Sequence, residues 1–196
     1  MVVEAFTYLL DLVIRWGSII ISPYRNLELL WIIVPALISW IFNEFYQEKI
    51  GTSFGNAISN GAVLLWVGVD WTRTTTNLLQ VDTLGIIIFK YSLALIAVLY
   101  GLFVIIWGAK GHKAVKFIGR ARNITYIIVM FSPLVYNAIP IDFETFLCIF
   151  LFFPIFYLVV EILDIIIPNP KIYQEDNPEI QPKTKNEEIV EYTDYV

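Results

Sequence analysis

Long runs of hydrophobic residues alternate with short polar segments along most of the chain. Crossing the hydrocarbon core of a bilayer takes an α-helix of about 20 mostly apolar residues. Five runs approach this length, at residues 27–46, 54–71, 84–108, 124–139 and 145–167. The pattern therefore predicts an all-α fold, a polytopic transmembrane bundle over residues 23–167 in which these five runs span the membrane.

Residues 1–22 predict a sixth helix of a different kind, because its polar positions form one narrow stripe. At 100° per residue the stripe gathers Glu4, Thr7, Tyr8, Asp11, Arg15, Ser18 and Ser22. Asp11 and Arg15 are four residues apart and can pair along the helix. The helix either spans the membrane with this pair turned to the bundle interior, or lies flat with the stripe in the headgroups. Because Glu4 stands where a signal peptide carries positive charge, we expect the segment to remain in the mature protein.

Composition supports the membrane class. Hydrophobic residues make up 58% of the chain and charged residues 16%, and the mean hydropathy is +0.68. Soluble domains carry about 25% charged residues, so this chain has too little charge to cover a soluble surface. An ordinary soluble enzyme, a disordered chain and a nucleic-acid binder are thereby excluded. One cysteine, Cys148, and one histidine, His112, argue against an internal disulfide, a metal centre or any other cofactor site.

The distribution of charge predicts the orientation in the membrane. The loop at residues 109–123 carries Lys110, Lys113, Lys116, Arg120 and Arg122. Cytoplasmic loops are enriched in Lys and Arg, so we place this loop and the C-terminus on the cytoplasmic side of a cell membrane. There the basic side chains are expected to contact anionic lipid headgroups rather than nucleic acid. Much of the net charge of −5 lies in the proline-containing, acidic segment 168–196, which predicts a flexible tail that could dock a soluble partner.

Small residues and asparagines mark two of the predicted helices. Ala57, Gly61 and Gly68 align on one, and Ala94, Ala97, Gly101 and Gly108 align on the other. Such stripes allow close helix packing in membranes. Asn56 and Asn60 lie one turn apart beside the first stripe. They either hydrogen-bond across a helix contact or line a path for a solute.

Several further residues have two readings. Pro35, Pro133 and Pro154 fall near the centres of three predicted helices, where they predict kinks that give ordinary curvature or surround a small polar cavity. Ser132 and Tyr136 share a face beside Pro133. Lys90 can extend outward or pair with Asp70. Glu44, Glu161 and Asp164 map to cytoplasmic helix ends, where they either pair with the basic loop or form a catalytic carboxylate cluster.

Three functions follow from these residues. The first is permeation or transport of a small solute or ion by a homo-oligomer, past the polar candidates Asp11, Arg15, Asn56, Asn60, Ser132 and Tyr136. The second is a non-catalytic scaffold or assembly factor that docks a soluble partner through its tail. The third is a membrane-embedded enzyme, for which no catalytic residue is assigned, because the motifs of intramembrane aspartyl proteases and of lipid phosphotransferases are absent. Transport is the leading hypothesis.

Overall fold

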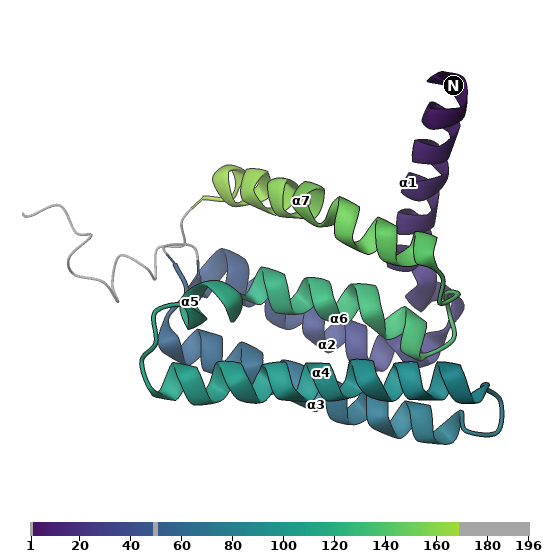
Figure 1. Ribbon diagram of the computed structural model, residues 1–196. Helices are drawn as coiled ribbons and strands as arrows, with labels where there is room; N and C mark the ends of the chain where they lie inside the picture. The colour runs from purple at the N-terminus through teal and green to yellow at the C-terminus, as the bar shows by residue number, and fades with distance from the viewer. Residues whose placement is uncertain (1, 49–50, 169–196) are drawn as a thin grey trace, which may run out of the picture.

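The computed structural model describes residues 2–48 and 51–168, and all regular elements in this part of the chain are helical (Figure 1). The all-α prediction is confirmed. The acidic segment 169–196, predicted to be a cytoplasmic tail, lies outside the described residues. The helices are α1 (Val2–Arg25), η1 (Leu27–Leu29), α2 (Leu30–Phe42), η2 (Asn43–Gln47), α3 (Phe54–Asn77), α4 (Leu84–Ala109), α5 (Val115–Ile118), α6 (Ala121–Val135) and α7 (Phe143–Ile166).

Helices α2, α3, α4 and α6 lie side by side, and α7 runs over α6 (Figure 1). Their core is formed by Leu29, Leu64, Trp71 and Ile128 among others. The short helix α5 and the basic loop lie at one end of the bundle, called here the basic end (Figure 1). At the opposite end α3 joins α4, and α6 joins α7. The two ends place different polar side chains on either side of the apolar core.

Helix α1 runs across the other helices at a steep angle, near the opposite end (Figure 1). It packs on the first part of α7, where Leu12 and Trp16 contact Cys148 and Phe152. The part of α1 before Asp11 is exposed on all sides. The direction of α1 therefore differs from that of the bundle helices (Figure 1).

Within the described residues, four helical segments are long and apolar enough to cross a membrane: Val3–Arg25, Leu27–Gln47, Leu84–Ala109 and Phe143–Ile166. Helix α3 carries Asp70, Arg73 and several threonines, which lower its hydropathy, and α6 has 15 residues. Most residues of α6 and one face of α3 are buried against neighbouring helices. The predicted count of five or six spans stays a prediction.

The two largest differences from the predicted boundaries are at the ends of α3 and α6. Helix α3 continues six residues past Trp71 to Asn77, and within this extension the Thr75 hydroxyl donates to the Trp71 carbonyl. Helix α6 ends at Val135, before the expected residue 139. Asn137 has a φ of 57°, in the left-handed region that terminates helices.

The contact between α3 and α4 is the closest in the bundle. The small residues predicted to form packing stripes face each other across it: a Cβ on Gly101 would lie 2.6 Å from the Gly61 carbonyl oxygen, and one on Gly68 would lie 3.0 Å from the Ala94 carbonyl oxygen. Ala57, Ala94 and Ala97 are buried beside them. Gly108 lies against Ile58 at the basic end. Backbones therefore touch along most of this pair.

Candidate functional site

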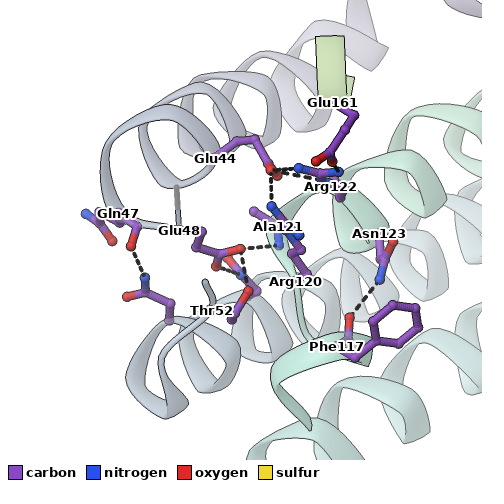
Figure 2. Close-up of polar contacts among 12 residues, drawn as sticks. Glu44, Gln47, Glu48, Thr52, Phe117, Arg120, Ala121, Arg122, Asn123 and Glu161 are labelled. Atoms are coloured by element: carbon purple, nitrogen blue, oxygen red, sulfur yellow. Dashed lines mark hydrogen bonds and ion pairs between the residues drawn. The ribbon is translucent and has the colours of Figure 1, made fainter. Parts of the chain in front are cut away.

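At the basic end a buried ionic network surrounds Arg122 (Figure 2). Its Nε donates to Glu44 Oε1 at 2.9 Å and its Nη1 donates to Glu161 Oε2 at 2.6 Å. Arg120 Nη2 donates to the same Glu44 oxygen at 3.0 Å. The Arg122 guanidinium also lies over the Tyr157 ring, 4.5 Å from its centroid. The network joins η2, α6 and α7, whose residues are far apart in sequence.

The network corrects one prediction from the sequence. Arg122 was expected to contact lipid headgroups, but its side chain is fully buried. A buried guanidinium needs a carboxylate partner, and Glu44, also fully buried, supplies it. Glu44 and Glu161 are therefore paired with Arg122 and do not form a free carboxylate cluster. The other basic candidates lie nearer the surface: Lys116 Nζ is 4.6 Å from the Phe54 ring centroid, and Lys110 and Lys113 are exposed.

Glu48 lies beside this network with different partners. Its Oε2 accepts hydrogen bonds from the Thr52 hydroxyl and from the Ala121 backbone N–H, both at 3.0 Å, and its Oε1 accepts from Asn60 Nδ2 at 2.8 Å (Figure 2). Burial raises the pKa of Glu48 above its ordinary value, and these hydrogen bonds oppose the rise. Glu48 thereby ties the end of η2 to the starts of α3 and α6.

Asn60 is a central part of the same region. Besides Glu48, its amide nitrogen donates to the Gly119 carbonyl at 2.9 Å, and its oxygen accepts from Asn43 Nδ2 at 2.9 Å. Asn43 in turn reaches the Ser39 hydroxyl on α2 at 3.4 Å. Asn56 is only partly buried, and its Nδ2 donates to the Gln47 carbonyl at 3.4 Å. The polar atoms of Asn60 are thus occupied by protein partners.

A cleft opens between α2 and α3 and begins at the opposite end of the bundle. Its mouth, a space of about 810 Å³, is lined by Glu28, Trp31, Trp66, Asp70, Arg73 and Tyr136 together with neighbouring apolar and polar residues. Asp70 is nearly buried: Arg73 Nε donates to its Oδ1 at 3.0 Å, and the Tyr136 hydroxyl donates to its Oδ2. This ionic cluster closes the inner wall of the mouth.

The cleft continues toward the basic end as an apolar furrow of about 610 Å³. The mouth and the furrow share Trp31, Ile32 and Trp66, and the furrow is also lined by Pro35, Ala36, Ser39, Ala62, Val63 and Val67. Pro35 has no N–H to donate to the Trp31 carbonyl one turn earlier. The furrow therefore leads from the mouth to Ser39, which is hydrogen-bonded to Asn43 and through it to Asn60.

Lys90 does not pair with Asp70, contrary to one expectation from the sequence. The buried Lys90 ammonium donates to Asp82 Oδ2 and to Asn137 Oδ1, both at 2.6 Å. Arg73, three residues from Asp70 on α3, takes the place predicted for Lys90. Burial of Asp82 opposes its ionisation, but the hydrogen bonds from Lys90 and Asn137 outweigh this effect and hold the pKa of Asp82 below its ordinary value.

Arg15 is also paired across the fold, and not with Asp11 as predicted. Its Nη1 donates to Asp142 Oδ2 at 2.6 Å and its Nη2 donates to Glu144 Oε2 at 2.8 Å. Burial opposes ionisation of Asp142, but hydrogen bonds from Thr145 and Arg15 lower its pKa overall. The α1 stripe, including Asp11 and Ser18, faces the loop at residues 138–144 across a cleft of about 510 Å³. The Arg15 side chain is long enough to reach the two carboxylates at the start of α7, and it binds these instead of Asp11.

The remaining candidates lie in separate parts of the bundle. The Ser132 hydroxyl accepts from Trp71 Nε1 at 3.1 Å inside the core, and Tyr136 is part of the mouth. Pro133 and Pro154 lie within α6 and α7, while Pro35 lines the furrow. Sequence reasoning did not single out Glu28, Trp31, Trp66 or Arg73. The sequence feature that could have identified them is their position. Two lie at the start of the predicted helix 27–46 and two near the end of the predicted helix 54–71, on the same side of the membrane.

No group of three or more metal-ligating side chains is present among the described residues. The comparisons with known proteins add no functional assignment. Neither the protein-family models, nor the curated proteins, nor the solved structures give a match to this chain. The function must therefore be argued from the geometry of the cleft and the networks.

Proposed function

We propose that this integral membrane protein is a transport component that carries an amphipathic molecule along the cleft between α2 and α3. The observation that carries the proposal is the cleft itself, which is polar at its mouth, apolar along the furrow and directed toward the polar residues of the basic end. An amphipathic solute suits such walls, whereas an ion would be unsolvated in the furrow. The apolar helices support the coarser statement, membrane protein.

The buried networks support a path along α2 and α3 rather than through the bundle centre. Glu44 with Arg122 closes one end of the core, and Asp70 with Tyr136 closes the other. Charged groups inside a membrane protein are expensive, and such pairs commonly border a solute pathway. Asn60, for which the sequence left a helix-contact role and a path-lining role open, is bonded within the protein. We therefore assign it to the closed end of the path and assign Ser39 to the end of the furrow.

A block in the furrow tests this proposal. Ala62 lines the furrow and is itself exposed, so Ala62→Trp fills the space without entering the core. The purified protein is reconstituted in liposomes that contain a phospholipid with a fluorescent group on one chain, and dithionite added outside bleaches each lipid that reaches the outer leaflet. We expect the native chain to accelerate bleaching and Ala62→Trp to lower that rate by about tenfold or more, equivalent to roughly 1.4 kcal/mol of barrier.

The matched control is Leu95→Trp, which adds a tryptophan at an exposed position of α4 that lines none of the clefts described above. It should move lipid at the native rate. Equal rates for Ala62→Trp and the native chain, or slow rates for both variants, would contradict transport along this cleft.

We further propose that the basic end faces the cytoplasm and that α1 lies along the outer surface. The positive-inside rule supports the first statement. The steep crossing of α1 and its stripe turned to the loop at residues 138–144 support the second (Figure 1). The oligomer and the tail partner expected from the sequence stay proposals of the same kind.

Cysteine labelling in intact cells tests this orientation. The native Cys148 is buried, with its Sγ donating to the Leu12 carbonyl, and should react little. Thr7→Cys lies on the polar stripe of α1, so a membrane-impermeant maleimide should label it from outside. Lys110→Cys in the basic loop should be labelled only after the cells are permeabilised. The reverse pattern, or protection of Thr7→Cys until permeabilisation, would overturn the arrangement.

A further inference from the structure

We infer that the cleft between α2 and α3 binds a zwitterionic phospholipid of the phosphoethanolamine type, with its headgroup in the mouth and one acyl chain in the furrow. The inference rests on the proposed function for the idea that the cleft is a binding path, and it adds the chemical class of the ligand. It depends on the charges of the mouth, on the two tryptophans at its rim and on the shape of the furrow.

The first observation is a cation held at the mouth. Arg73 uses its Nε and Nη2 to bind Asp70 Oδ1, at 3.0 and 2.8 Å, and the Tyr136 hydroxyl binds the other Asp70 oxygen. Asp70 is therefore fully engaged, and it fixes the direction of Arg73. The Arg73 side chain remains 61% exposed, so its Nη1, which does not bind Asp70, can donate hydrogen bonds to a phosphate.

The second observation is an anion on the facing wall. Glu28 belongs to η1 at the start of α2 and lines the same mouth. Its backbone N–H is bonded to the Asn26 side chain, while no described residue bonds its carboxylate. A cation on α3 and an anion before α2 therefore border one opening. A phosphate linked to an ammonium group matches both, whereas a purely anionic headgroup would meet the uncompensated charge of Glu28.

The third observation concerns the rim. Trp31 on α2 and Trp66 on α3 are 79% and 68% exposed, and both line the mouth and the furrow. Indole rings favour the level of the headgroups, where one edge is apolar and the N–H is hydrated. An ammonium group over an indole face gains a further cation–π attraction. The two rings thus mark the depth at which the headgroup of a bound lipid would end and its acyl chain begin.

The fourth observation is the furrow below the rim. Its small side chains Ala36, Ala62 and Val63 leave about 610 Å³ along the surface of the bundle. This volume lies within the range of about 300–1,000 Å³ typical of small-molecule sites. The furrow has apolar walls and continues directly from the mouth. An acyl chain attached to a headgroup in the mouth would lie along it.

Native mass spectrometry of the full chain tests the inference. The protein is extracted from vesicles of equal phosphatidylethanolamine and phosphatidylglycerol, and retained lipids are counted for the native chain, Arg73→Gln, Glu28→Gln and Arg25→Gln. We expect the native chain to retain phosphatidylethanolamine about tenfold over phosphatidylglycerol, and Arg73→Gln and Glu28→Gln each to lose about tenfold of that retention, as for a lost charge-assisted contact. Arg25→Gln, which lies in the cleft beside α1, is the control and should retain lipid normally.

Equal retention of the two lipids, or native retention by Arg73→Gln and Glu28→Gln, would overturn the inference. Thermal unfolding of each variant in detergent shows whether it is folded. We expect both to fold, because the Arg73 and Glu28 side chains lie largely at the surface. Binding and movement are measured separately. Selective retention without lipid movement in the dithionite assay would leave the ligand assignment standing and overturn transport, whereas movement without headgroup selectivity would overturn the ligand assignment alone.

Discussion

Arg122→Met is expected to destabilise the protein by about 3–5 kcal/mol, the range found when one partner of a buried ion pair is removed. The substitution keeps most of the side-chain volume but removes the guanidinium that binds Glu44 and Glu161. Glu44 is fully buried, and Arg120 alone would remain to balance its charge. Denaturant or thermal unfolding of the detergent-solubilised protein measures the loss.

Three further variants separate the buried pair from general surface charge. Lys113→Met removes an exposed cation from the same loop and should stay within about 0.5 kcal/mol of the native chain. Glu161→Gln should have a small effect, about 1 kcal/mol or less, because the Glu161 side chain is 52% exposed. Combining Arg122→Met with Glu44→Leu should recover part of the stability, since no unpaired buried carboxylate remains. An Arg122→Met protein as stable as the Lys113→Met protein would show that Glu44 does not depend on Arg122.

Gly101→Ala is expected to separate α3 from α4, at a cost of about 1–3 kcal/mol. The added Cβ would lie 2.6 Å from the Gly61 carbonyl oxygen and 2.8 Å from the Leu65 backbone nitrogen. Both atoms belong to the backbone of α3, so no side-chain rotation can relieve the contact. Unfolding measurements should show the loss, and a disulfide or spin-label pair across the two helices should report the increased separation.

Gly85→Ala is the matched control, because it makes the same substitution on the same helix. A Cβ on Gly85 meets no atom within 4 Å. Alanine is the better helix former, so this variant should be neutral or more stable by up to about 1 kcal/mol. Equal stability of the two alanine variants would mean that α3 and α4 do not pack through Gly61 and Gly101.

The fold class followed from the sequence because it depends on local hydropathy. Apolar runs of about 20 residues have few options other than a membrane helix. The glycine and alanine stripes were readable for a similar reason: residues three, four and seven apart share one face of any helix. Gly61 and Gly101 could therefore be assigned to packing faces before the helix they contact was known.

The sequence could not determine which partner each long charged side chain selects. The structure pairs Arg15, Lys90 and Arg122 with Asp142, Asp82 and Glu44, which are 127, 8 and 78 residues away in the sequence. Such choices depend on which helices are neighbours and on depth along them. For Arg15 the helical spacing suggested Asp11, but Arg15 pairs with residues at the start of α7. For Lys90 the sequence left extension outward and pairing with Asp70 open, and the second alternative is wrong because Asp82, in the loop before α4, binds it.

The sequence by itself determined that this protein is built of apolar helices, where its close-packing faces lie, and which polar residues lie among apolar ones. These properties depend on local composition and on the helical repeat. Only the tertiary structure decided the direction of α1, the pairing of the buried charges, and the cleft between α2 and α3. A helix with one narrow polar stripe has the same sequence pattern whether it crosses a bilayer or lies on it. A cleft depends on how two helices pack against each other and on whether a third element fills the space between them, and local sequence specifies neither.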